Sequence, residues 1–301
     1  MIPEKQNAQI NIDRLSAQRN LYTQAKQLHL LRMVLTIPCV LLLSLLVAFL
    51  PIASWLFAAF SISVFALDQI FLRSQLQTKK GIGALIQEEF DCDVLELPWN
   101  SIMNPSRCQR EDCIHYSTQY KKNKKNKIDS LGDWYESINY DAIPQNARRL
   151  ICQRSNVTWD AALRRRYNNL MYIAGGVGVI VLIIAACIYD LEFRSFIIIT
   201  AAGVAPIAGF IVGEMKDNNE AISKLDKAKH VIESLWEGIL TRTIDDTKQL
   251  ETSRQLQDLI FGMRKMNPLI PDWIYWKHRP EQVSLMNQIV EQMSNEYLAR
   301  Q

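Results

Sequence analysis

The stretch that decides the fold runs from Leu170 to Gly213 and reads LMYIAGGVGVIVLIIAACIYDLEFRSFIIITAAGVAPIAGFIVG. No charged side chain occurs from Leu170 to Tyr189 or from Ser195 to Gly213, and only five residues separate the two runs. As helix, each run extends about 28–30 Å, which is about the thickness of the hydrocarbon core of a bilayer. The sequence therefore predicts two membrane-spanning helices, at 170–189 and 195–213, joined by a short turn.

An earlier apolar block predicts a first hairpin of the same kind. Residues 33–50 carry no charge, Pro51 interrupts the block, and the apolar run that follows reaches Asp68 before its first charge. We place spans at 33–50 and 52–72, the second with Asp68 near the inner interface. Overall composition hides these blocks, because 22% charged residues and a net charge of +3 are typical of a soluble protein. The predicted fold class is a mainly α polytopic membrane protein with four transmembrane helices in two hairpins.

The polar segments predict the domains and their orientation. We expect an amphipathic N-terminal arm at 1–32, a sensor domain at 73–169 and a helical C-terminal region at 214–301. These segments hold 5, 16 and 12 Lys and Arg residues, whereas the two turns between spans hold only Arg194. Since positive residues stay on the cytoplasmic side, both termini and the sensor domain should face the cytoplasm from the inner membrane.

Local patterns predict the elements of the polar segments. The sensor domain should begin as a helix from residue 73 to Phe90 and then contain a short strand at 94–97, which makes it a small α+β insertion. Pro144 should open a helix. In the C-terminal region we expect helices at 214–243, 245–266 and 281–298. The first of these carries Leu225, Ile232, Trp236 and Ile239 at near-heptad spacing, which suits packing within the chain or between subunits.

Several motifs, together with the two-plus-two arrangement of spans, resemble those of the SMODS-associated four-transmembrane effectors of bacteria. They are Asp91–Asn100 (DCDVLELPWN), Asp133–Tyr135 (DWY), Cys152–Asn156 (CQRSN) and Pro271–Trp273 (PDW). The resemblance covers nearly the whole chain. It implies the membrane-damaging arm of a CBASS-type anti-phage system, switched on by a cyclic oligonucleotide that a neighbouring nucleotidyltransferase makes. It supplies no ligand-binding residues, which have to come from the chemistry of the side chains.

A sensor for an anionic nucleotide needs cations for phosphates, aromatic faces for bases, and donors or acceptors for base edges. The sensor domain offers all three kinds of side chain. The candidates are Arg107, Arg110, Arg148, Arg149 and Arg154 for phosphate, Trp99, Trp134 and Tyr135 for stacking, and Asn100, Gln153 and Asn156 for base edges. The alternative is that the tryptophans belong to the core and the arginines lie at an anionic lipid surface.

Two patterns within the apolar blocks suggest how a pore would be built. Ser54, Ser61 and Asp68 recur every seven residues, so they share a face that could line a water path. The alternative is that the serines bond their own backbone and Asp68 only caps the inner end of the helix. A stripe of small residues in the last span allows close helix packing, within one subunit or between subunits; it consists of Ala201, Ala205, Gly209 and Gly213.

Catalysis and metal binding find little support in the sequence. Cys108, Cys113, His115 and Cys152 are the only plausible zinc ligands, and their spacing fits no compact Cys-x-x-Cys pair, so we predict no metal. No P-loop, Gly-x-Ser-x-Gly or His-Glu-x-x-His motif occurs, so we predict no enzyme and no cofactor.

The leading hypothesis is an anti-phage effector that opens or disrupts the inner membrane when a cyclic di- or trinucleotide binds the sensor domain. Because four simple helices enclose little lumen, we expect a homo-oligomer in contact with the lipid bilayer, functionally linked to a cyclic-oligonucleotide synthase, and no DNA or RNA polymer as partner. Two alternatives stay open: a non-conducting membrane scaffold that recruits a partner, and a membrane-anchored enzyme.

Overall fold

A computed structural model describes residues 2–36, 39, 54–123, 128–135, 142–188 and 205–300. These residues are mainly helical, and no strand occurs among them. The α-helices are α1 (Ile2–Asn7), α2 (Gln9–Thr36), α4 (Ser54–Leu67), α5 (Arg73–Val94), α6 (Arg110–Lys122), α7 (Gln145–Ile188), α9 (Ala205–Leu240), α10 (Asp246–Met266) and α11 (Asp272–Ala299). A π-helical turn, η2 (Asp68–Leu72), joins α4 to α5, and a 3-10 turn, η3 (Ile128–Leu131), follows α6.

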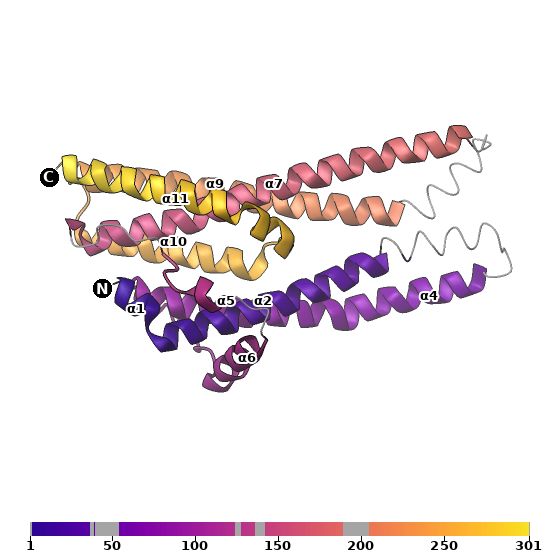
Figure 1. The fold of residues 1–301 in the computed structure, drawn as a ribbon, viewed down its shortest axis with the longest axis horizontal. Coiled ribbons are helices and arrows are strands. Elements are labelled where there is room, and N and C mark those ends of the chain that lie inside the picture. The colour runs from indigo at the N-terminus through magenta and orange to yellow at the C-terminus, as the bar shows by residue number, and fades with distance from the viewer. Residues whose placement is uncertain are drawn as a thin grey trace.

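Two long pairs of helices run along the same axis (Figure 1). In the first pair, α2 packs against α5, which continues through η2 into α4; in the second, α7 packs against α9. Helix α10 contacts α5, α7 and α9 and so joins the two pairs, while α11 packs on α7 and α6 on α2. Both chain ends lie at the same end of the molecule (Figure 1).

The largest core cluster lies among α7, α9, α10 and α11. The near-heptad residues of α9, namely Leu225, Ile232, Trp236 and Ile239, are 0–6% exposed and pack there. They meet α7 through residues such as Leu150 and α10 through residues such as Ile260. The predicted helical face is therefore confirmed, and it is covered within the chain itself.

Several helix boundaries follow from signals that the sequence carries. Pro144 does precede a helix, since α7 begins at the next residue, and α10 matches its predicted range closely. The Asp245 side chain caps α10 by accepting a hydrogen bond of 2.7 Å from the backbone N–H of Lys248. Asn267 and Pro268 then end this helix, as their sequence predicts.

The strand predicted at 94–97 is wrong, and so is the α+β character of the insertion in the described residues. Helix α5 continues to Val94 and closes with a left-handed residue, Glu96, at φ 55°. The backbone N–H of Leu97 donates to the carbonyl of Cys92 over 3.0 Å, which is the long bond of a Schellman motif. The apolar residues after the helix pack as its C-cap, so their alternation does not reflect a strand.

The four predicted transmembrane helices are also a wrong assignment. Across the ranges that the structure describes, no helix combines the length and the apolar character needed to cross a bilayer. Helix α4 has 14 residues, about 21 Å, and the apolar residues 170–188 and 205–213 are only parts of the much longer, partly polar α7 and α9. The remainder of the predicted spans and the two turns between them, residues 37, 38, 40–53 and 189–204, lies outside the described residues.

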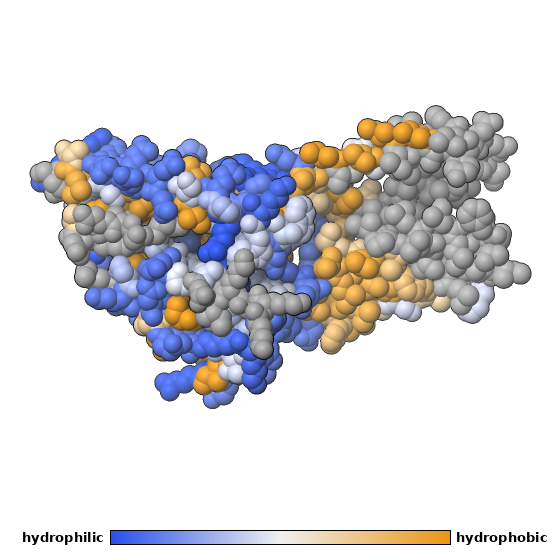
Figure 2. Space-filling model, in the orientation of Figure 1, coloured by the Kyte–Doolittle hydropathy of each residue, from blue (hydrophilic) through white to orange (hydrophobic). Residues whose placement is uncertain are grey.

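One end of the molecule is nevertheless strongly apolar at its surface. Figure 2 shows hydrophobic residues gathered over α4 and the neighbouring parts of α7, whereas the opposite half is mostly hydrophilic. Large exposed side chains in this apolar end, as we call it, are Trp55, Ile62, Phe65, Ile70, Phe71, Ile173, Val177, Ile180 and Ile184. Contiguous exposed apolar surface of this kind is typical of contact with a membrane or another protein.

Candidate functional site

A cavity of about 510 Å³ lies in the polar half, where the two helix pairs meet. Its walls come from α2, α7, α10, the loop after α10, α11 and residues 130–135. This volume is in the range of pockets that hold drug-sized ligands. The cavity therefore joins parts of the chain that lie far apart in the sequence.

Cations outnumber acids in the wall of the cavity. The basic residues are Arg19, Lys26, Arg164, Arg264 and Arg279, and the acidic residues are Asp133, Asp160 and Asp272. The same wall also contains five aromatic side chains, namely Tyr22, Trp134, Tyr135, Trp159 and Tyr275. Cations beside aromatic faces can bind an anionic ligand with planar rings.

Arg19 of α2 occupies the most aromatic part of this wall. Its guanidinium carbon lies 5.0 Å from the ring centroid of Tyr275 and 5.7 Å from those of Trp134 and Trp276. Such distances permit cation–π attraction. Arg279 of α11 approaches the same Trp276 ring at 5.4 Å. Two guanidinium groups from opposite ends of the chain thus share one indole ring.

A buried polar network around Asp91 holds two of the side chains that line the cavity, Tyr135 and Arg264. Asp91 of α5 is fully buried and accepts hydrogen bonds from Arg264 (2.5 Å), Gln257 (2.8 Å) and the hydroxyl of Tyr135 (2.7 Å). The same Tyr135 hydroxyl accepts a 3.1 Å hydrogen bond from Asn156. Burial raises the pKa of Tyr135 well above its ordinary value, so the hydroxyl keeps its proton and can donate to Asp91.

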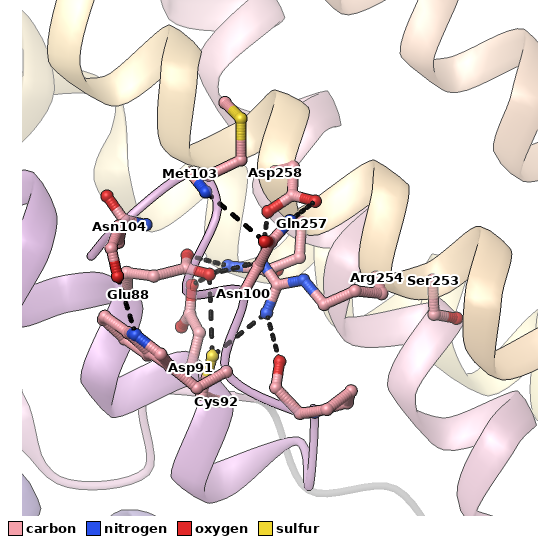
Figure 3. A network of polar contacts seen from close by, with 12 residues as sticks. Glu88, Asp91, Cys92, Asn100, Met103, Asn104, Ser253, Arg254, Gln257 and Asp258 are labelled. Carbon is pink, nitrogen blue, oxygen red and sulfur yellow. Dashed lines mark hydrogen bonds and ion pairs between the residues drawn. The ribbon is translucent and has the colours of Figure 1, made fainter. Parts of the chain in front are cut away.

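The network continues beside the cavity and ties α5 to α10 (Figure 3). Arg254 donates to Glu88 over 2.5 Å and to Asp258 over 2.9 Å, and it also reaches the Pro98 carbonyl at 3.0 Å. Burial raises the pKa of Glu88, and the charge of Arg254 opposes that rise. Because Glu88 is 1% exposed, this ion pair is screened little by water and fixes the two helices together.

Comparison with known proteins identifies the family. The model of the SMODS-associating 4TM effector domain matches residues 1–293. The chain belongs to this family. A similar protein is a probable CBASS effector molecule of Bacillus cereus (strain VD146), 25% identical over 305 residues that cover 95% of this chain and 96% of the relative. No solved structure matches.

Family membership confirms the resemblance that the motifs carry. Together with the relative, it indicates a CBASS effector in anti-phage defence, and hence a link to a cyclic-oligonucleotide signalling system. The family is one of effector domains. Its name also associates this S-4TM chain with membranes.

Three of the residues predicted to bind ligand do line the cavity of this S-4TM chain. They are Trp134, Tyr135 and Asn156. The Tyr135 ring is 3% exposed and stacks on Phe90, with ring centroids 6.1 Å apart, so it contributes mainly to the core. Trp134 is half-buried and keeps its contact with Arg19.

Four other candidates from the CQRSN region and its helix lie outside the cavity. Arg149 donates to the carbonyls of Leu95 (2.8 Å) and Glu96 (3.3 Å) and so caps the end of α5. Gln153 is fully buried and bonds to α10, while Arg154 forms a 2.7 Å ion pair with α9 at Glu233. Arg148 does not line the cavity either. Three of these four side chains therefore hold α7 against its neighbours.

The last four candidates lie in the loop after α5 and at the start of α6. The indole N–H of Trp99 donates to the carbonyl of Asn104 over 3.0 Å, and the guanidinium carbon of Arg107 lies 4.9 Å from the Trp99 ring centroid. Asn100 donates to Asp258 over 2.8 Å and thereby joins the network of Figure 3. Arg110 begins α6 and is exposed. Trp99 and Arg107 therefore contact one another and Asn100 contacts α10, whereas Arg110 lies apart on α6; none of the four lines the cavity.

The predicted pore and packing residues are only partly described. Asp68 forms an ion pair with Arg32 of α2, with 3.0 Å between Nη2 and Oδ2. The side chains of Ser54, Ser61 and Ala205, and all of Ala201, lie outside the described residues. A Cβ atom added at Gly209 or Gly213 would meet nothing within 4 Å, so no described side chain or helix packs closely against these two glycines.

The three cysteines named as possible zinc ligands do not all come together. Cys152 lies in the core cluster around Phe90, whereas Cys108 and Cys113 pack with α2 and α5. Within the described ranges, no group of three His, Cys, Asp or Glu residues is arranged to hold a metal ion.

Sequence reasoning missed the residues that give the cavity its charge. Arg19 and Lys26 belong to the segment that we interpreted as an N-terminal arm, and Arg279 follows the aromatic run Trp273–Trp276 in the C-terminal region. The sequence did contain one signal for an aromatic, cationic site, namely this aromatic run, which overlaps the Pro271–Trp273 motif and is followed by Arg279. Nothing in the sequence indicated that it faces α2.

Proposed function

We propose that this S-4TM chain permeabilises the bacterial inner membrane when a cyclic di- or trinucleotide binds its cavity, and so aborts phage infection. The single observation that carries the proposal is the division of the molecule into a cationic, aromatic cavity and an apolar end. Family membership supports a link to a cyclic-oligonucleotide signalling system, and this division supports assigning ligand binding to the cavity and membrane contact to the apolar end.

The composition of the cavity supports a cyclic oligonucleotide as the ligand. Its phosphodiesters are anionic, which suits a wall in which five cations face three acids. Its bases are planar, which suits the rings of Trp134 and Tyr275, and their edges can pair with amides such as Asn156 and Asn287. A volume of about 510 Å³ admits at least one nucleotide of such a ligand in an enclosed position.

The apolar end supports action on lipid. Ile70 is 78% exposed and Phe65 is 66% exposed. Contact of such large apolar side chains with water is unfavourable, and covering them with a bilayer or a partner lowers the free energy. We propose that this end enters the membrane and that several copies assemble there to make the leak. Both chain ends lie opposite it (Figure 1), so we place them with the cavity on the cytoplasmic side, where a second messenger is made.

The test is dye and ion release from liposomes that contain the purified full chain, during titration with a panel of cyclic di- and trinucleotides. We expect release with at least one of them and none without ligand. Phe65→Lys should reduce release by placing a charge in the apolar end. Ile114→Lys is the matched control, because Ile114 is also 66% exposed but lies on α6.

Two results would contradict the proposal. Silence of inserted protein across the whole panel would remove the ligand-gated activity. Tight binding of a nucleotide without any release would favour the non-conducting scaffold instead.

A further inference from the structure

We propose that Arg19 and Arg279 together form the phosphate clamp of the cavity, so that the bound ligand bridges α2 to α11. The inference deepens the proposed function and rests on it for the identity of the ligand. It assigns phosphate binding to two arginines that the sequence patterns did not indicate, in place of the arginines of the sensor domain.

The other cations of the cavity are already neutralised. Lys26 pairs with Asp272 at 2.5 Å, and Arg264 pairs with the buried Asp91 at 2.5 Å. Arg164 is 5% exposed and bonds to Asp160, to Asn218 and to the Pro268 carbonyl. If Lys26, Arg164 or Arg264 turned to bind a ligand, its carboxylate would lose its ion-pair partner. The loss raises the free energy of the protein most where the carboxylate is buried.

Arg19 and Arg279 differ from them in the contacts they make. Among the side chains that the structure describes, which do not include that of Asp129, neither has a carboxylate within ion-pair distance. Arg19 reaches only the Tyr275 hydroxyl, at 3.4 Å, and its Nε is buried without a hydrogen-bond partner. Arg279 donates to the Ser130 carbonyl at 3.3 Å. A guanidinium has five N–H donors, so most donors of both groups remain available to a ligand.

The third acid of the cavity does not supply the missing charge. Asp133 accepts a 2.8 Å hydrogen bond from Asn7, and the Asn7 side chain in turn accepts from the backbone N–H of Asp133. This reciprocal pair turns the carboxylate toward α1. Among the described side chains, the like charges of Arg19 and Arg279 therefore lie near one another without a counter-ion of their own, and an anion bound between them relieves their repulsion.

The aromatic rings fix the geometry of the clamp. Trp276 lies 5.7 Å from the guanidinium carbon of Arg19 and 5.4 Å from that of Arg279, so one short ligand can reach both. A guanidinium that stacks on a ring keeps its N–H edges free, and those edges match the oxygens of a phosphate. Trp134, which lines the cavity at 5.7 Å from Arg19, then offers a face for an adjacent base.

Bridging these residues links the two helix pairs. Arg19 belongs to α2, which packs against α5 in the first pair, and Arg279 belongs to α11, which packs on α7 in the second. A ligand held by both arginines favours whichever arrangement of the pairs brings them to its phosphates, and it can shift the resting structure only by that difference in affinity. The clamp would thus convert binding into a movement between α2 and α11.

Calorimetry on the full chain tests the clamp, with the cyclic nucleotide panel and inorganic pyrophosphate as probes. Arg19→Gln and Arg279→Gln should each weaken binding about tenfold or more, and the double variant should bind neither probe measurably. Arg165→Gln is the matched control, because Arg165 pairs with Asp226 at an exposed site outside the cavity, and it should bind like the wild type.

Folding has to be separated from binding. Since neither arginine forms an ion pair in the described structure, the Gln variants should keep the helical signal and the thermal midpoint of the wild type. Arg19→Lys guards against a packing defect: it keeps the charge but loses the planar fork, so its affinity should fall between those of wild type and Arg19→Gln.

The outcomes distinguish the clamp from the proposed function. If a nucleotide binds and triggers leak equally well in wild type and in both Gln variants, the clamp is refuted and the proposed function stands. If no nucleotide binds but pyrophosphate does, and both Gln variants lose it, the anion clamp is supported and the proposed function fails. If neither probe binds the wild type, both are refuted.

Discussion

Replacing Arg264 by methionine should destabilise the protein severely, because it leaves the buried carboxyl group of Asp91 without its cationic partner in the core. Asp91 is 0% exposed, and Arg264, which is 14% exposed at its side chain, is the only cation bonded to it among the described residues. The hydroxyl of Tyr135 and the amide of Gln257 would remain as neutral donors. Removing one partner of a buried ion pair costs about 3–5 kcal/mol.

The assay is urea unfolding of the full chain in a mild detergent, followed by the helical circular dichroism signal. Against a total stability of about 5–15 kcal/mol, a loss of about 3–5 kcal/mol should shift the midpoint far outside error. Arg165→Met is the control, since Arg165 and Asp226 are 51% and 43% exposed and such pairs contribute about 0–1 kcal/mol.

A second variant isolates the cause of the loss. Adding Asp91→Asn to Arg264→Met removes the buried charge and keeps an acceptor for Tyr135, so part of the lost stability should return. If Arg264→Met costs no more than Arg165→Met, or if Asp91→Asn makes it worse, then the joint between α5 and α10 does not depend on a charged Asp91 and our account of it is wrong.

Three further predictions concern other parts of the molecule. Gly238→Ala should cost about 1–3 kcal/mol by thermal unfolding, because a Cβ there would lie 2.7 Å from Cγ1 of Ile244; an unchanged midpoint would mean that the side chain moves aside freely. Lys80→Met should cost about 1–3 kcal/mol, because the buried Lys80 ammonium donates to two carbonyls at the end of α10, and an exposed lysine such as Lys248 changed to Met should not. Burial lowers the pKa of His29 from 6.5 to about 4, so the unfolded state binds its proton first, and stability should fall as pH drops from about 6.5 toward 4. His29→Gln should flatten that part of the profile of thermal midpoint against pH, and a profile identical to wild type would contradict the assignment.

The elements of the polar half could be predicted where the signal is local. The near-heptad face of α9 and the capped, proline-terminated α10 depend on residues within a few turns of one another. The strand at 94–97 failed for the opposite reason. A short apolar run beside a proline looks the same in a strand and in a helix C-cap, and only the φ of 55° at Glu96 decides between them.

The cavity could not be predicted, because its contacts join distant parts of the chain. Arg19 and Tyr275 are 256 residues apart, and no periodicity relates them. Arginine candidates present a related problem. The sequence shows that Arg149 and Arg154 are cations, but not that Arg149 is occupied by two backbone carbonyls and Arg154 by Glu233. An arginine available to a ligand is defined by the partners it lacks, which only the fold reveals.

The DCDVLELPWN motif begins beside the cavity, at the end of α5 that lies farther from the apolar end. Asp91, in the DCDVLELPWN stretch, bonds to Arg264 and Tyr135, and both of these residues line the cavity. Asp91 also belongs to α5, which continues without interruption through η2 into α4 at the apolar end. A ligand that displaces Tyr135 or Arg264 therefore acts on α5 through a buried carboxylate, without intervening flexible chain. This gives the motif a physical role in joining the two ends, and a chain with Asp91→Asn should bind ligand more nearly normally than it releases dye.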